Sequence, residues 1–193
     1  MTTNQNEVTI VNRIAEITTT EDIFPEYRNT PIGLLLEYHN LNRSIESYWQ
    51  AQLLIGTCMD NRIHLRLPDN FAFMIRAGGA NLRYSEFTVS YAIAVGNIQH
   101  IAIIAHSQCG MVNLNARKSQ FVNGLADRAD WNKDHVREHF MHLAPLFEIG
   151  NEIDFVLSEA KRLRERYPKV TVAPLFYKVE DNRLYLLKEK DKV

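Results

Sequence analysis

The sequence predicts an α/β fold with a mainly parallel β-sheet core, an antiparallel final strand and flanking helices. Short apolar runs alternate along the chain with longer segments of helical spacing, which is typical of parallel strands joined by helices. The last two apolar runs, Val170 to Tyr177 and Arg183 to Leu187, are separated by the turn-like Glu180-Asp181-Asn182. A turn this short implies a hairpin, so we expect the final strand to run antiparallel.

The N-terminal part of the chain precedes the first predicted strand. Met1 to Asn6 is polar and has the composition of a tail, and Glu7 to Ile17 fits either a short helix or a strand. Pro31 stands at the start of a segment with helical spacing, which predicts a helix from about Pro31 to Tyr48. We therefore expect residues 1–193 to form one domain with an N-terminal helical arm over about residues 7–48.

The middle of the chain carries three more strand-like apolar runs. They are Gln52 to Thr57, Phe71 to Arg76 and His100 to Ala105. A helix is expected from Ser85 to about Val95, where Gly96-Asn97 ends it. Beyond these elements, the pattern predicts a turn and helix over 110–122, a polar loop over 124–130 and helices over 132–147 and 151–167.

The composition gives no reason to expect a nucleic acid or a membrane as a partner. The formal net charge is -1, and 46% of the residues are hydrophobic, which is ordinary for a globular domain. No apolar run approaches the length of a membrane span, and Met1 to Thr9 lacks the apolar core of a signal peptide. We therefore expect a cytoplasmic protein, whose thiols stay reduced.

The only two cysteines of the chain stand at the carboxyl ends of predicted strands. Cys58 follows Gln52 to Thr57, and Cys109 lies three residues after His106, where the next apolar run stops. Ligands collect at the carboxyl ends of strands in open parallel sheets. Two sulfurs and one imidazole suit tetrahedral zinc, and three protein ligands leave a fourth position open. The pattern predicts one metal site made by Cys58, His106 and Cys109.

Two other interpretations of these residues remain. Both cysteines could be small buried side chains, with His106 an ordinary loop residue. They could also form a redox pair, although the chain has no Cys-x-x-Cys motif. His64 and His100 are near enough in sequence to complete a closed, four-ligand site.

A carboxylate and a guanidinium follow the first cysteine. Asp60 and Arg62 are two residues apart, so on an extended loop they face the same side. An exposed ion pair of this kind contributes little to stability. Directly after a predicted ligand, however, Arg62 can hold the charge and orientation of Asp60 for chemistry at the metal.

These residues together resemble a known family. Cys58-Met-Asp60-Asn-Arg62 and His106-Ser-Gln-Cys109-Gly110 are similar to the Cys-x-Asp-x-Arg and His-x-x-Cys motifs of the β-class carbonic anhydrases. The similarity runs from about Pro31 to Leu187 and includes the Arg76-Ala-Gly78-Gly79 segment. Trp49 stands where many plant-type members carry a substrate-holding Gln. The chain thus resembles the compact branch of the family that lacks this Gln.

The resemblance implies reversible hydration of carbon dioxide to bicarbonate. One Zn²⁺ per chain would be held by Cys58, His106 and Cys109, and zinc-bound hydroxide would attack carbon dioxide. Asp60 would orient the hydroxide while Arg62 holds Asp60. In some members of the family the same Asp instead binds zinc and closes the site.

The resemblance leaves other functions open. Enzymes with a similar zinc motif hydrolyse carbon disulfide or carbonyl sulfide, and a non-catalytic homologue would bind zinc and sense bicarbonate. Three glycines are expected to support the backbone around the substrate, namely Gly78, Gly79 and Gly110.

The resemblance also implies a homodimer or homotetramer. The apolar segment from Tyr27 to Tyr48 precedes the first core strand, and we expect it to expose an apolar patch that a second copy covers. His135, His139 and His142 share one side of a predicted helix, where they could bind a metal, relay protons or simply face solvent or an interface.

Overall fold

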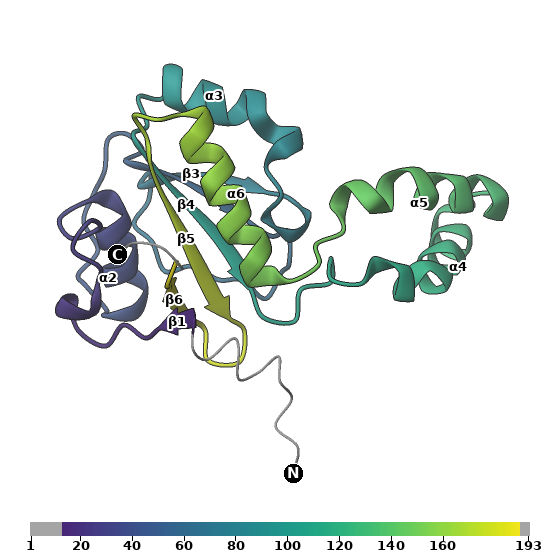
Figure 1. Cartoon of the computed structure of the whole chain (residues 1–193), viewed down its shortest axis with the longest axis horizontal. Coiled ribbons are helices and arrows are strands. Elements are labelled where there is room, and N and C mark those ends of the chain that lie inside the picture. The colour runs from purple at the N-terminus through teal and green to yellow at the C-terminus, as the bar shows by residue number, and fades with distance from the viewer. Residues whose placement is uncertain (1–12, 190–193) are drawn as a thin grey trace, which may run out of the picture.

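A six-stranded sheet forms the centre of the molecule (Figure 1). The structure, a computed structural model, describes residues 13–189, so the predicted tail over 1–6 lies outside the described residues. The strand order is β1-β6-β5-β4-β2-β3, and the four strands from β5 to β3 run parallel. Strand β6 is antiparallel to β5, as predicted, and β1 is antiparallel to β6. The strands are β1 (Ile14–Ala15), β2 (Leu53–Thr57), β3 (Ala72–Arg76), β4 (His100–His106), β5 (Thr171–Lys178) and β6 (Arg183–Leu187).

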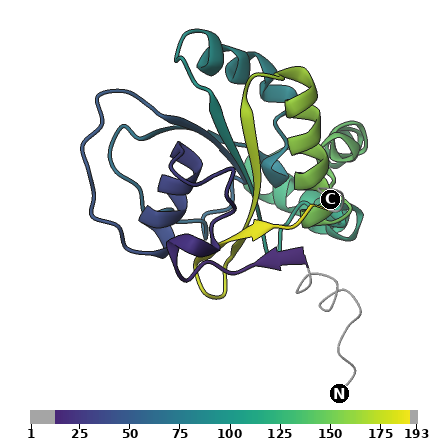
Figure 2. The ribbon, with the colours of Figure 1, turned by 60° about the vertical axis from the view of Figure 1, so that its left-hand side comes forward.

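Helices cover both faces of this sheet and thereby confirm the predicted fold class. Figure 2 shows α2 on one side of the sheet and α3 and α6 on the other, while Figure 1 shows α4 and α5 projecting beyond the sheet. The helices are α2 (Pro31–Asn40), α3 (Glu86–Ala94), α4 (Lys118–Ala129), α5 (Lys133–Phe147) and α6 (Glu152–Arg166). Short 3-10 turns are η1 (Thr20–Asp22), η2 (Gly78–Ala80), η3 (Arg83–Ser85) and η4 (Leu114–Arg117). Within residues 13–189, no helix is long and apolar enough to span a membrane.

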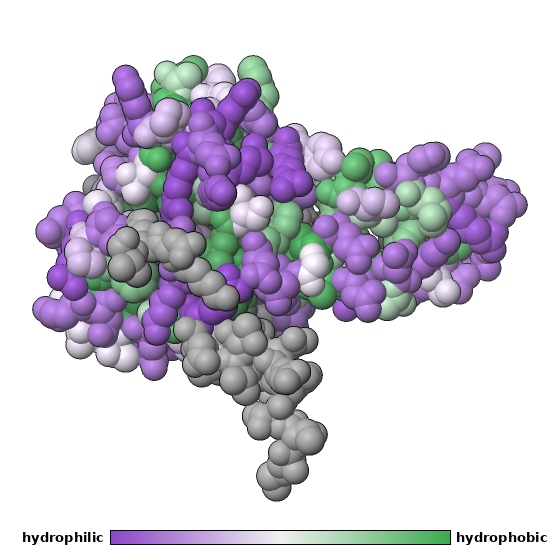
Figure 3. Space-filling view, viewed as in Figure 1, coloured by the Kyte–Doolittle hydropathy of each residue, from purple (hydrophilic) through white to green (hydrophobic). Residues whose placement is uncertain are grey.

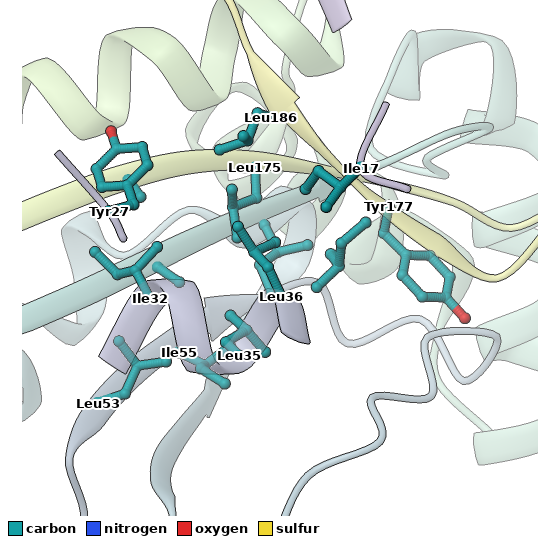
Figure 4. Close-up of a cluster of buried hydrophobic side chains, with 14 of the residues drawn as sticks. Ile17, Tyr27, Ile32, Leu35, Leu36, Leu53, Ile55, Leu175, Tyr177 and Leu186 are labelled. Carbon is teal, nitrogen blue, oxygen red and sulfur yellow. The ribbon is translucent and has the colours of Figure 1, made fainter. Parts of the chain in front are cut away.

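The alternation of side chains along each strand divides the core into two layers. In β4, Ala102 and Ile104 face the α2 side, whereas Ile101 and Ile103 face α3 and α6. The α2 layer also contains both cysteines. Figure 4 shows Ile32, Leu35 and Leu36 of α2 packed against the strands. The strand residues in this contact are Leu53 and Ile55 of β2, Leu175 of β5 and Leu186 of β6. Because β2, β4 and β5 are buried on both faces, they are rigid supports for the loops at their ends.

The helix predicted over Pro31 to Tyr48 ends early, at Asn40. Asn42 has a φ of +54°, in the left-handed region, and the Arg43 backbone N–H donates back to the Glu37 carbonyl. The apolar spacing also stops here, because most of residues 41–50 are exposed. Without a buried side, these residues gain too little from packing to extend the helix.

One further prediction about an element was wrong. The polar segment 124–130 is not a loop, because α4 runs through it to Ala129. The N-terminal arm expected over about residues 7–48 contains α2, and in its ambiguous segment 7–17 Ile14–Ala15 pairs with β6 as a short strand. Residues 7–12 lie outside the described part of the chain.

Candidate metal centre

Sheet register brings the three predicted ligands together. Strands β2 and β4 are parallel neighbours with Thr57 opposite Ile104, so Cys58 and His106 leave the sheet at the same edge. Cys109 lies in the loop that follows β4. All three side chains are buried, and their ligand atoms lie within 4.8 Å of one another, with 4.0 Å between the two Sγ atoms. The three residues could hold a metal ion, and they are the only such group of three within residues 13–189.

The imidazole of His106 has one nitrogen free for a metal. Its Nδ1 lies 2.9 Å from the Ser107 carbonyl oxygen, to which only an Nδ1–H can donate. Its Nε2 is buried and has no hydrogen-bond partner. A buried nitrogen without a partner is costly, whereas a lone pair fixed by a hydrogen bond on the other nitrogen is the arrangement of metal-binding histidines. The orientation of His106 therefore fits a metal ligand.

The electrostatics of the site favour a cation. The neighbouring Cys109 thiol and the His106 ring lower the pKa of Cys58 to about 4 against the opposing effect of burial. The same proximity, together with burial, raises the pKa of Cys109, since a second thiolate beside the first is unfavourable. Although burial disfavours a charged imidazole, Cys58 and Asp60 raise the pKa of His106. A divalent cation would allow both sulfurs to be thiolates.

Two glycines allow the backbone to approach the first ligand closely. The Gly79 backbone N–H donates to Cys58 Sγ over 3.4 Å, and Gly79 has a φ of +65°, which a side chain would disfavour. A Cβ on Gly78 would lie 3.0 Å from Met111 Sδ. By contrast, a Cβ on Gly110 would meet no atom within 4 Å. The structure thus gives a steric reason for glycine at 78 and 79 and none at 110.

Asp60 and Arg62 form a tight pair beside the ligands. Arg62 Nε donates to Asp60 Oδ1 over 2.9 Å and Nη2 donates to Oδ2 over 2.8 Å, and the Arg62 backbone N–H also donates to Oδ1. These bonds hold the pKa of Asp60 well below its usual range. Asp60 Oδ2 lies 4.0 Å from His106 Nε2, so the ionised carboxylate faces the position of a metal while it stays paired with Arg62.

Sequence reasoning assigned no role to two other residues that hold this site. Arg76, at the end of β3, donates from Nη1 to the Asp60 carbonyl over 3.2 Å and from Nη2 to the Ile63 carbonyl. Glu152, at the start of α6, accepts from the Cys109 backbone N–H over 3.2 Å. An acidic residue in a first helical turn is common, so no pattern marked Glu152.

The other histidines lie outside the metal centre. His64 and His100 are not in the ligand group, so within the described residues no fourth Cys or His closes the site. On α5, His135 and His142 are exposed, whereas His139 packs against Phe121 and Trp131. His139 thus has a packing role between α4 and α5, and the histidine stripe forms no metal group in the described structure.

Comparison with solved structures identifies the fold. The isoform I β-carbonic anhydrase of Trichomonas vaginalis superposes with a TM-score of 0.60, covering 98% of this chain and 100% of that one at 15% identity. The chain has the β-carbonic anhydrase fold. A carbonic anhydrase from Glaciozyma antarctica gives a TM-score of 0.56 at 17% identity, over 71% of this chain and 83% of that one. No protein-family model matches the sequence, and no curated protein matches it.

The β-carbonic anhydrase fold also includes a hydrolase. A carbon disulfide hydrolase in its apo form superposes with a TM-score of 0.51 at 17% identity, over 75% of this chain and 80% of that one. At such identities the likeness shows the fold alone. The choice between these activities therefore depends on the residues of the site.

Proposed function

We propose that the protein is a zinc-dependent carbonic anhydrase that interconverts carbon dioxide and bicarbonate. The observation that carries this proposal is the Asp60–Arg62 pair beside the buried set of Cys58, His106 and Cys109, with Asp60 Oδ2 4.0 Å from the free His106 Nε2. A structural zinc site needs four closed ligands and no charged pair at an open position. A non-catalytic zinc protein would have no use for an ionised carboxylate held at this point.

The roles of the residues follow from this geometry. Zinc held by Cys58, His106 and Cys109 would supply a Lewis acid that makes water a nucleophile near neutral pH. Asp60 is ionised and can accept a hydrogen bond from a water in the open position, which fixes the direction of that water's lone pair. Arg62 keeps Asp60 in this orientation through its two side-chain bonds. The Gly79 N–H stabilises the negative charge on Cys58 Sγ.

An apolar groove beside the centre suits an uncharged substrate. It has a volume of about 290 Å³. Met59 and Met111 line it close to the ligand residues, and Leu143 and Phe147 line it from α5. Figure 3 shows apolar surface where the α4–α5 pair joins the body of the molecule. Carbon dioxide is small and apolar, so such a wall would admit it without competing for the polar groups of the site.

The same groove favours a second candidate, hydrolysis of carbon disulfide or carbonyl sulfide. Both are apolar and linear, and one solved structure of this fold is a carbon disulfide hydrolase. Stopped-flow assays of the zinc-loaded protein with carbon dioxide, and sulfide release with carbon disulfide, distinguish the two. We expect rapid hydration of carbon dioxide. Turnover of carbon disulfide alone would establish the second candidate instead, and turnover of neither would favour a non-catalytic zinc protein.

We also propose that the protein works as a homodimer, or as a tetramer of two dimers. The apolar patch expected on Tyr27 to Tyr48 is not the reason, because α2 buries its apolar side within its own chain. A different surface supports it: exposed apolar side chains occur on the edge strand β3, on η3 and on α3 with the residue that follows it. They are Phe73, Met74, Tyr84, Phe87, Tyr91 and Val95.

The chemistry of the site further supports a reducing compartment such as the cytoplasm. Cys58 and Cys109 are free thiols and must stay so to bind a metal. Their Sγ atoms are only 4.0 Å apart, so oxidation to a disulfide would remove two of the three ligands.

A further inference from the structure

The carboxylate of Glu180, in the final hairpin, is hydrogen-bonded to the loop between His106 and Cys109. Glu180 lies in the turn between β5 and β6, and it accepts from Ser107 Oγ over 2.7 Å and from Gln108 Nε2 over 2.8 Å. Ser107 Oγ in turn accepts from the Val179 backbone N–H, and the Ser107 backbone N–H donates to the Tyr177 carbonyl, so four hydrogen bonds join the hairpin and the loop. Ser107 and Gln108 are the residues between His106 and Cys109.

Gln108 connects this carboxylate to Arg62. Its Oε1 accepts from Arg62 Nη1 over 3.2 Å, and its backbone carbonyl accepts from Arg62 Nη2 over 3.1 Å. The side-chain amide is therefore oriented, because its NH₂ group must face Glu180 and its oxygen must face Arg62. Gln108 has a φ of +57°, a left-handed conformation that non-glycine residues adopt at a cost.

Four of the five N–H donors of the Arg62 side chain are thereby used. Nε and Nη2 bind Asp60, and Nη1 and Nη2 bind Gln108. With only the Asp60 bonds, an exposed guanidinium could rotate together with the carboxylate it pairs with. The bonds to Gln108 remove this freedom, since they fix the guanidinium to the ligand loop as well.

We propose that Glu180 is a positioning residue that holds Arg62, through Gln108, in the orientation in which Arg62 directs Asp60 toward the metal centre. The catalytic consequence rests on the proposed carbonic anhydrase function, whereas the relay itself does not. Glu180 and Gln108 are exposed, so their bonds contribute little to the stability of the fold. These bonds instead fix the orientation of Arg62. A small change in orientation affects a catalytic step far more than it affects the stability of the fold.

Glu180→Ala and Glu180→Gln test the relay, with Asp181→Asn as the matched control. Asp181 lies in the same turn, but its hydrogen bonds come from the Arg183 N–H and the Tyr185 hydroxyl and not from the ligand loop. Glutamine at 180 has one side-chain carbonyl oxygen, so it can accept one of the two bonds that the carboxylate accepts. Gln108→Asn breaks the relay at its middle and keeps a residue that tolerates a positive φ.

The first measurement uses metal-free protein and needs no activity. Exchange of the Arg62 Nε–H with water, followed by nitrogen-15 NMR, reports whether the guanidinium is held. We expect Glu180→Ala and Gln108→Asn to speed this exchange about tenfold, Glu180→Gln to have a smaller effect, and Asp181→Asn to have none. Unchanged exchange in both Glu180→Ala and Gln108→Asn would overturn the proposal.

The second measurement is turnover of zinc-loaded protein. We expect Glu180→Ala to bind zinc fully and to lose about tenfold in kcat, the lower end of effects seen for outer partners of a metal site, with KM nearly unchanged. Partial recovery in Glu180→Gln would support positioning by hydrogen bonds. Faster Arg62 exchange with unchanged kcat would overturn the catalytic part. If the wild-type protein does not hydrate carbon dioxide, the proposed function fails, and the exchange data still decide on the relay.

Discussion

At the residue scale, Cys58, His106 and Cys109 each supply one of three ligand atoms within 4.8 Å of one another. We expect Cys109→Ala to lose most of its zinc, because two ligands bind a divalent ion far more weakly than three. Elemental analysis after dialysis measures this. His142→Ala, which changes an exposed histidine on α5, should keep one zinc per chain. Full occupancy in Cys109→Ala would show that this ligand set is wrong.

Asp60 and Arg62 touch the site without being required as permanent ligands. We expect Asp60→Asn and Arg62→Ala each to keep zinc and to lose about a hundredfold in hydration rate, the scale of a lost acid–base or orienting group. Asparagine at position 60 keeps the shape of the aspartate side chain but removes the negative charge that Arg62 binds. Stopped-flow hydration assays at matched zinc content provide the measurement. Near wild-type turnover in either variant is incompatible with the orienting role.

The charges of the site also predict how activity depends on pH. Hydrogen bonds from Arg62 keep the pKa of Asp60 well below its usual range, so Asp60 stays ionised at and above neutral pH and its protonation does not shape the profile there. Two thiolate ligands would leave more negative charge on a bound zinc ion than three imidazoles would, so a water on that ion would lose its proton at higher pH. We expect activity to rise from neutral toward alkaline pH, as initial rates across a buffer series will show. A flat profile would contradict this prediction.

At the element scale, α2 holds the layer of core that contains both cysteines. Leu36 is fully buried there, so Leu36→Ala should lower the free energy of unfolding by about 2–5 kcal/mol through lost burial and a residual cavity. Ile45→Ala is the control, because Ile45 is 51% exposed beyond the end of α2. Urea unfolding followed by circular dichroism measures both. Equal stabilities of the two variants would mean that α2 is not part of the cooperative core.

Strands β2, β4 and β5 could be predicted closely from the sequence because burial on both faces makes each one a short, continuous apolar run. The edge strand β3 is largely exposed, but its residues are also mostly apolar and β-favouring. The ends of helices were harder to place. The helix beginning at Pro31 stops at Asn40 because Asn42 turns left-handed and the chain leaves the core, and neither event has an apolar signature. Helix α4 was missed in part because its polar residues are solvated on a helix that projects from the body.

In the candidate site, too, some residues could be predicted from the sequence and others could not. Cys58, Asp60, Arg62, His106 and Cys109 were predictable because each follows a recognisable strand within three residues or belongs to one of two short motifs. The contacts of Glu180 were not predictable. It is more than 70 residues from its partners in the ligand loop, and only the pairing of β4 with β5 brings its turn to them. Side-chain partners that depend on strand order leave no local pattern in the sequence.

At the scale of the whole molecule, the apolar surface on α3 and β3 predicts a dimer. Phe87, on α3, is 82% exposed, and burying such a ring against a second copy is a strong driving force. We expect the wild-type protein to sediment as a dimer or tetramer at micromolar concentration and Phe87→Arg to shift it toward smaller species. Met141→Arg, on the projecting α5, should leave the mass unchanged. A wild-type monomer in analytical ultracentrifugation would refute the assembly.

One titration tests both zinc binding at the metal centre and the dependence of carbon dioxide hydration on that zinc. Zinc is added stepwise to metal-free protein, and the rate of carbon dioxide hydration is measured at each step by stopped flow. We predict that the rate rises in proportion to bound zinc and stops rising at one zinc per chain, because Cys58, His106 and Cys109 form the only three-ligand group in the described structure. Hydration no faster than in buffer, with the site fully loaded, would contradict the account.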